Sequence, residues 1–118
     1  MRLTETGFGD ARPIDGYGPG FFRVGGEVHV GGVLVAPGGT GAWQGLGDTA
    51  PLLALAGEVD VLLLGMGRTI GHPPKALTEP LESAGIGVEP MDSPAAARTY
   101  NVLLSEGRRV AAALLPVD

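Results

Sequence analysis

A short glycine-containing segment follows a strongly apolar run. The run Val59–Leu64 predicts a buried strand and leads directly into the sequence Gly-Met-Gly-Arg. In α/β folds, ligands lie beyond the carboxyl ends of parallel strands, and glycines there expose backbone N–H groups to an anion. The dinucleotide fingerprint needs a further glycine where Ile70 stands, so the nucleotide signal is weak. Two interpretations stay open, a tight turn or a ligand-binding loop formed by Gly65, Met66, Gly67 and Arg68.

Arg98 and Asn101 form the second candidate site. They are three residues apart in a predicted helix and therefore share a face. If the sheet is parallel, the early turns of this helix lie near the glycine loop. Arg98 would then bind a carboxylate or phosphate through its guanidinium fork. The alternative, which we favour, is that Arg98 mainly braces the loop through carbonyls or Asp92, because a buried guanidinium needs partners.

The residue types needed for common catalytic and metal sites are missing or scattered. The chain has no cysteine, which excludes disulfides, thiolate metal sites and cysteine nucleophiles. His29 and His72 are the only histidines and have no metal-site spacing. No serine lies in the G-x-S-x-G context of a hydrolase. We expect no metal, no cofactor and no catalytic residue. A non-catalytic protein is favoured, and an enzyme stays open as the alternative.

Trp43 is the single tryptophan and lies in a glycine-rich stretch. A packed tryptophan buries on the order of 200 Å², so we expect Trp43 to anchor this stretch on the core. The alternative is a contact with a partner protein.

The first part of the chain predicts turns and a hairpin. Residues 15–20 have the glycines and proline of a turn. Residues 21–24 and 27–30 read as strands joined by Gly-Gly, which suits a primed two-residue turn. A further apolar strand is expected at 33–36.

The second part alternates helices with strands, and Pro80 complicates one helix. Because an interior proline removes a backbone donor, we expect a short helix that is capped by Thr78 and has Pro80 in its first turn. The best helix start has Asp92 or Ser93 as the cap and Pro94 at the first position. The expected elements are a helix from Asp48 or Thr49 to Gly57, a strand at 59–64, a helix from Thr78 to Ala84, a strand at 86–89, a helix from Pro94 to Gly107 and a strand at 110–115.

This order predicts one α/β domain over residues 1–118, with an irregular segment at 1–12. We expect a layered α/β domain with a largely parallel sheet, and the N-terminal β-hairpin indicates either a mixed sheet or a small accessory sheet.

Composition narrows the function classes. The chain has 118 residues, 44% of them apolar, and a net charge of −5. No basic stripe is visible, so we expect no nucleic-acid partner. No apolar run approaches the ~20 residues that a spanning helix needs, and the N-terminus has no signal-peptide pattern. We expect a soluble, acidic, cytoplasmic protein without membrane insertion.

Three segments together resemble a known family. They are residues 14–24 (IDGYGPGFFRV), 62–67 (LLLGMG) and 84–114, the last containing Arg-Thr-Tyr-Asn at 98–101. They resemble small bacterial proteins related to mitochondrial complex I assembly factor 3 and to the adipogenesis-associated domain protein of animals. The resemblance covers about residue 10 to the end.

The resemblance implies a three-layer α/β fold whose last strand is antiparallel to the rest of the sheet. It also implies a non-catalytic protein that acts through protein partners of a respiratory or membrane-associated complex. Related eukaryotic proteins are mitochondrial. The chain departs from the family pattern at Met66, where a small residue is usual, and at Ala97, where cysteine is common.

Two functions therefore stay open: an assembly factor, or an anion-binding protein or enzyme that uses the pocket at Gly65–Arg68 with Arg98 and Asn101. An exposed apolar patch would favour the first, and a concave pocket with converging polar groups the second. Self-association stays open with either function.

Overall fold

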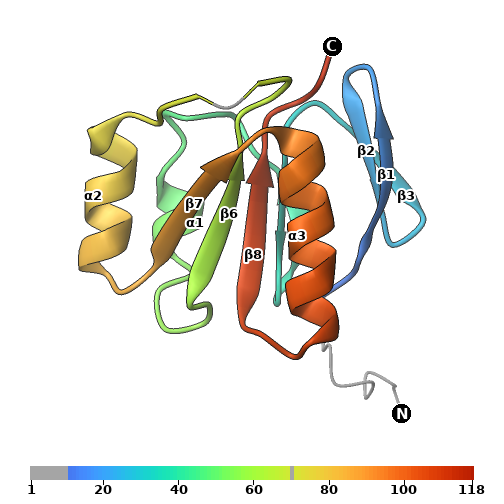
Figure 1. The fold of residues 1–118 in the computed structure, drawn as a ribbon. Helices are drawn as coiled ribbons and strands as arrows, with labels where there is room; N and C mark the ends of the chain where they lie inside the picture. Colours follow the sequence, from blue (N-terminus) through green and yellow to red (C-terminus); the bar gives the residue numbers. More distant parts are fainter. Residues whose placement is uncertain (1–10, 70) are drawn as a thin grey trace.

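The computed structural model describes residues 11–69 and 71–118, which form one mixed α/β fold (Figure 1). Most of the segment expected to be irregular, residues 1–12, lies outside the described residues. In chain order the elements are β1 (Ile14–Gly18), β2 (Phe21–Val24), β3 (Glu27–Val30), β4 (Val33–Ala36), β5 (Gly39–Ala42), α1 (Ala50–Leu53), β6 (Val61–Gly65), α2 (Lys75–Ser83), β7 (Gly87–Met91), α3 (Ser93–Ser105) and β8 (Val110–Leu114).

The strands form two sheets. The central sheet has the order β5-β4-β8-β6-β7, and a small antiparallel sheet has the order β1-β2-β3. β6 is parallel to both β7 and β8, whereas β4 is antiparallel to β8 and β5. The predicted mixed sheet with an N-terminal hairpin is confirmed.

The expected direction of the last strand is wrong. β8 runs parallel to β6, and β4 is the strand that opposes its neighbours. The reason is the connection: α3 carries the chain from the end of β7 back to the starting edge of the sheet, so β8 enters in the direction of β7. β4 and β5 are joined by a tight hairpin, which reverses the chain.

Both faces of the central sheet are covered. Leu63 points to the cluster that contains Tyr100 of α3 and Phe22 of β2. Leu62 and Leu64, on either side of it, point to the opposite cluster, with residues of α1 and α2. Figure 1 shows α3 in front of the sheet with the small sheet beside it, and α1 behind. The expected three layers are present.

β8 is the middle strand and is buried along its whole length. Its sequence is Val-Ala-Ala-Ala-Leu, and alanine is a weak strand former. Small side chains here let the elements on both faces approach closely, since Ala112 faces α3 while Ala111 and Ala113 face the other cluster. This segment is therefore a strand because β4 and β6 pair with it on both sides, although its residues have a low intrinsic preference for strands.

The predicted hairpin of β2 and β3 is confirmed. Gly25 and Gly26 connect them with φ of 57° and 86°, which is the double positive φ of a type I′ turn.

Two strands were not predicted. β1 occupies most of the expected turn at 15–20, and β5 lies in a stretch read as loop. Both are rich in glycine, which local propensity counts against strands. Each is held by an antiparallel neighbour, β2 for β1 and β4 for β5.

Two helices differ from their predicted bounds. α1 ends at Leu53, short of Gly57, and the Thr49 side chain makes no capping bond. α2 begins at Lys75 and contains Pro80 in its interior, so the short helix capped by Thr78 is wrong. Leu77 and Leu81 are both fully buried, and they anchor the helix on either side of the exposed proline.

Candidate functional site

Ser93 joins the glycine loop to the start of α3. Its backbone N–H donates to the Gly67 carbonyl at 2.7 Å, and the Gly67 N–H donates back to Ser93 Oγ at 2.9 Å. The same hydroxyl donates to the Leu115 carbonyl at 2.6 Å. Ser93 is fully buried, so one side chain ties together the ends of β6 and β8 and the first turn of α3.

The glycines of this loop serve close packing. A Cβ on Gly65 would lie 2.6 Å from Ser93 Oγ and 2.9 Å from Ser93 Cα, closer than real Cβ atoms approach. Gly67 has a φ of +89°, which favours glycine. The Met66 N–H donates to the Met91 carbonyl at 2.8 Å. The N–H groups of residues 66 and 67 are therefore bonded within the protein, which supports the tight-turn interpretation.

Arg68 and Arg98 do not brace the loop. Arg68 is exposed and donates to the backbone carbonyl of Asp118. Arg98 is exposed and makes no hydrogen bond or ion pair with residues 11–69 or 71–118. The expectation of a buried Arg98 that braces the loop is wrong. Ser93, which lies directly against the loop, makes the hydrogen bonds that hold it. From the sequence, Ser93 was considered as a helix cap and rejected as a hydrolase nucleophile, and its contact with the glycine loop was not predicted. Its position at the start of the helix that follows β7 was the available signal.

Asp92, not Ser93, caps α3. Its carboxylate accepts from the Ala95 N–H at 2.8 Å, and Pro94 occupies the first turn, as the sequence predicts. The cap fixes where the helix begins, and so which residues of α3 face β1.

Asn101 holds the edge of the small sheet. Its Oδ1 accepts from the Ile14 N–H at 2.8 Å, and its Nδ2 donates to the Ile14 carbonyl, also at 2.8 Å. The side-chain amide thus pairs with Ile14 as a neighbouring strand would. The residue just before it, Tyr100, lies on the buried face of α3. Its hydroxyl donates to the Arg12 carbonyl at 3.0 Å, and burial raises the pKa of Tyr100 to about 12.

Arg98 and Asn101 share a hollow with β1 and not with the glycine loop. The hollow has a volume of about 300 Å³. It is lined by Ile14, Asp15, Gly16, Tyr17, Pro94, Ala97, Arg98 and Asn101. The prediction grouped Arg98 and Asn101 with Gly65–Arg68, but the loop residues are not among those that line this hollow. The candidate site thus divides into a packed junction at Ser93 and an open hollow at Arg98.

Trp43 belongs to the core. Its side chain is 2% exposed and packs in the cluster with Leu52 and Leu64. The indole N–H donates to the Asp48 carbonyl at 3.0 Å. The anchoring interpretation is supported, and the indole offers almost no surface for the partner contact that was the alternative.

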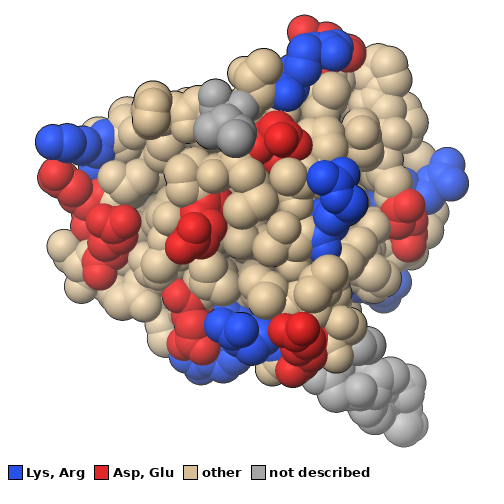
Figure 2. Space-filling model, in the orientation of Figure 1, with Lys and Arg blue, Asp and Glu red and all other residues tan. Residues whose placement is uncertain are grey.

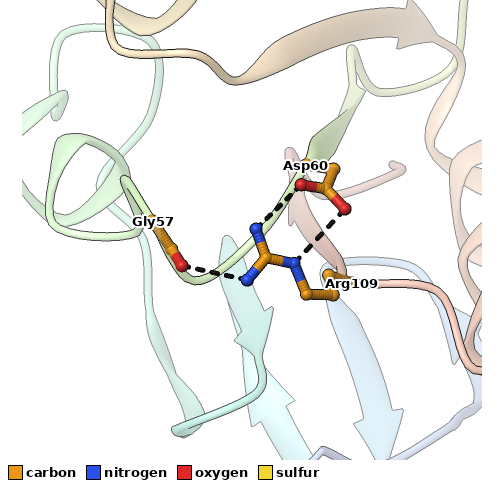
Figure 3. Close-up of polar contacts among 3 residues, drawn as sticks. All are labelled: Gly57, Asp60 and Arg109. Atoms are coloured by element: carbon orange, nitrogen blue, oxygen red, sulfur yellow. Dashed lines mark hydrogen bonds and ion pairs between the residues drawn. The ribbon is translucent and has the colours of Figure 1, made fainter.

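Asp60 and Arg109 form an ion pair at the opposite end of the strands from the glycine loop, where β6 and β8 begin (Figure 3). Arg109 Nη2 lies 2.8 Å from Asp60 Oδ1, and Nη1 donates to the Gly57 carbonyl at 3.0 Å. The hydrogen bond from Arg109 holds the pKa of Asp60 below its ordinary value. Both side chains are more than half exposed, so this is a surface clamp between two strand starts.

The described residues contain no group of three His, Asp or Glu side chains placed to hold a metal ion. None of the helices in the described part is long and apolar enough to cross a membrane. On the face in Figure 2, acidic and basic side chains are interspersed and no basic surface is continuous.

The outer face of the small sheet carries exposed apolar side chains. Phe22 and Val24 point into the core, so their neighbours along β2, Phe21 and Arg23, point outward. The β3 residues opposite them are Val30 and Val28, which share that outer face. Val28 is 54% exposed and Val30 is 83% exposed. We call these two exposed valines, together with the half-buried Phe21, the outer apolar patch.

Comparison with known proteins places this architecture in a family. An uncharacterised protein of Rhodobacter capsulatus is 59% identical over 117 residues, covering 99% of this chain and 94% of that protein. A Danio rerio protein, NADH dehydrogenase [ubiquinone] 1 alpha subcomplex assembly factor 3, is 32% identical over 110 residues. That match covers 87% of this chain and 63% of the relative.

The fold agrees with a solved structure. The crystal structure described as an outer membrane protein from Bartonella henselae superposes with a TM-score of 0.85 at 35% identity. The match covers 92% of this chain and 97% of that one. The family model for the protein of unknown function DUF498/DUF598 matches residues 14–115, from the start of β1 to one residue past β8. The matched residues contain all the strands and helices described above. The chain therefore belongs to the DUF498/DUF598 family.

Proposed function

We propose that this protein is a non-catalytic interaction protein that assists the assembly of a respiratory complex of the NADH dehydrogenase type. The observation that carries the proposal is the outer apolar patch, where two valines of one strand are more than half exposed. Exposed apolar surface on a small protein is typical of a contact site for another protein. Similarity to the Danio rerio assembly factor supports the kind of complex involved.

The glycine loop argues in the same direction. Its N–H groups at Met66 and Gly67 are bonded to Met91 and Ser93, so they are not free to cradle an anion. The glycine loop, which suggested ligand binding in the sequence, thus uses these N–H groups to hold the protein's own fold together.

Deletion of the gene tests the proposal. In the cell that makes this protein, loss of the gene is expected to lower the amount of assembled NADH dehydrogenase complex, while the other respiratory complexes stay constant. Native gel electrophoresis with activity staining measures both. An unchanged amount of the assembled complex would show that the proposal is wrong.

A second candidate is an anion-binding protein that uses the hollow between β1 and α3. The specific observation is Arg98, whose exposed guanidinium lines the hollow together with Tyr17 and Pro94. Planar guanidinium groups recognise carboxylates and phosphates by paired hydrogen bonds. Asp15 lines the same hollow, and its carboxylate accepts a hydrogen bond from the Gly26 N–H, which points part of its negative charge toward the backbone.

Arg98→Lys separates this candidate from the first. Lysine keeps the charge but loses the planar fork. If the hollow binds an anion, phosphate or a small carboxylate raises the melting temperature of the parent protein, and Arg98→Lys loses that rise. If anions leave the parent melting temperature unchanged, the second candidate is wrong.

A further inference from the structure

The four edges of the two sheets are not equally protected. An open edge presents unpaired N–H and C=O groups, and proteins cover such edges or interrupt them with proline or charge. β1 is covered by α3, where Asn101 pairs with Ile14. β7 contains Glu89 and Pro90, and proline is tolerated in a sheet mainly at an edge. β5 consists of Gly-Thr-Gly-Ala and offers little side-chain surface.

β3 carries one of these devices, the charge of Glu27, and only at its first residue; the rest of the strand has neither proline nor an Asp, Glu, Lys or Arg side chain. Its sequence is Glu-Val-His-Val, without proline or lysine, and both valines point to the outer face. The strand lies at the end of the order β1-β2-β3, so one of its sides faces no other strand of the described chain.

The hairpin register shows which backbone groups face this free side. A two-residue turn closes with a doubly hydrogen-bonded pair, here Val24 and Glu27, and such pairs alternate along the ladder. The next such pair is Phe22 with His29, and the bond from the Gly31 N–H to the Gly20 carbonyl at 2.8 Å continues the pattern. The N–H and C=O groups of Val28 and Val30 therefore point away from β2. No hydrogen bond to these groups occurs within the described chain.

We propose that β3 pairs with β3 of a second copy of this chain, antiparallel, about a two-fold axis at His29. In this register Val28 lies opposite the partner subunit's Val30, and Val30 opposite the partner subunit's Val28. Each pair exchanges two backbone hydrogen bonds, because these are the residues whose N–H and C=O groups face outward. The two small sheets become one continuous antiparallel sheet.

The side chains suit a second copy. Glu27 lies opposite the partner subunit's Gly31, so no like charges face each other directly. On the inner face, His29 lies directly opposite the partner subunit's His29 and diagonal to the partner subunit's Glu27, which is a favourable polar neighbour in either copy. On the outer face the valines form cross-strand pairs, and β-branched residues pack well in that position.

The length of the strand limits the strength of the pairing. Gly31 has a φ of +89°, so the extended backbone ends after Val30 and only a short segment can pair. Interfaces this small form weak dimers. The inference goes beyond the proposed function and does not depend on it, but it has a consequence for it: pairing joins two outer apolar patches into one wider surface.

Sedimentation velocity of the full chain tests the pairing. Between about 10 μM and about 1 mM, the weight-average mass is expected to rise from monomer toward dimer. A parent protein that stays monomeric throughout this range overturns the proposal.

Two substitutions at one position test the backbone edge itself. Val30→Pro removes an N–H that faces outward and leaves the β2 ladder intact, so it is expected to raise the dimer dissociation constant by at least about tenfold. Val30→Thr is the matched control, because it keeps the N–H and the β-branched shape and changes only the outer side chain. It is expected to keep the dissociation constant within about threefold. If both variants dimerise like the parent, another surface forms the dimer and the proposal is wrong.

Hydrogen exchange of the parent protein keeps the test decisive if Val30→Pro folds poorly. The Val28 and Val30 amides are expected to exchange more slowly at high protein concentration, while exposed amides of α3 do not change. Concentration-independent exchange at both valines overturns the pairing. Failure here leaves the gene-deletion result untouched, so the two proposals are tested separately.

Discussion

Asn101 shows how one side chain can replace a strand. Its amide has a carbonyl acceptor and two N–H donors, and Ile14 bonds to the oxygen and to one of the N–H groups. The N-terminal strand is thereby tied to α3, eighty-seven residues away in sequence. Asn101 was a candidate ligand residue from its position beside Arg98, and the structure gives its polar atoms an internal partner.

Asn101→Ala is expected to lower the free energy of unfolding by about 1–3 kcal/mol, because the part-buried N–H and C=O of Ile14 lose their partner. Chemical denaturation measures the change. Val102→Ala on the exposed side of the same helix is the control, with an expected change within about 0.5 kcal/mol. Equal effects of the two substitutions would contradict the role of Asn101.

Gly65→Ala tests the packed junction. Its Cβ would be 2.9 Å from Ser93 Cα, and backbone cannot give way cheaply, so a loss of about 1–3 kcal/mol is expected. Gly41→Ala is the matched strand control, since nothing lies within 4 Å of its added Cβ. A Gly65→Ala variant as stable as Gly41→Ala would mean that α3 does not pack against the loop as described.

For single residues, the sequence was enough to identify which residues matter, but it often did not predict what each of them does. Asp92 as the cap and Trp43 as a core residue follow from local chemistry and packing area. The roles of Ser93 and Arg98 do not, because they depend on how far α3 lies from the glycine loop. The absence of a side chain at Gly65 lets Ser93 approach the loop closely. A glycine in the sequence, however, does not indicate which other residue will pack against it.

Among the elements, α2 departs most from local rules. Pro80 lacks the N–H that would bond to the Ala76 carbonyl, yet the helix runs from Lys75 to Ser83. Burial of Leu77 and Leu81 outweighs this loss, and both Ala76 and Pro80 are exposed, so water can satisfy the freed carbonyl.

Pro80→Ala is therefore expected to raise the free energy of unfolding by about 1–3 kcal/mol, since it restores the helical hydrogen bond. The thermal midpoint and the denaturant midpoint measure it. A decrease would show that the proline is accommodated outside a regular helix.

The elements that sequence predicts well are those with their own apolar pattern: β6, α3 and the β2–β3 hairpin. β1 and β5 were missed because glycine-rich segments become strands only when a neighbour supplies the hydrogen bonds. The direction of β8 was wrong for the same kind of reason, because strand direction is a property of connections and not of composition.

For the molecule as a whole, Tyr100 connects pH to stability. Its folded pKa of about 12 lies above the ordinary value of 10.0, so the folded state keeps the phenolic proton after the unfolded state has lost it. The stabilisation is complete below pH 10 and is lost as pH rises toward 12. The slope reaches at most about 1.4 kcal/mol per pH unit.

Tyr100→Phe is expected to flatten this alkaline decline, at a cost of about 0.5–1.5 kcal/mol near pH 7 for the lost bond to Arg12. Unfolding curves from pH 8 to 12 decide it. A decline as steep in Tyr100→Phe as in the parent would assign the pH dependence to another group.

The account as a whole rests on the outer apolar patch as the contact surface. The most direct test returns variants to a strain that lacks the gene and measures the assembled NADH dehydrogenase complex. The double variant Val28→Glu/Val30→Glu is expected to fail to restore the complex. The control Val102→Glu, on a valine of α3 that is about as exposed as Val28, is expected to restore it. Full restoration by the double variant, at normal protein level, would contradict the central claim.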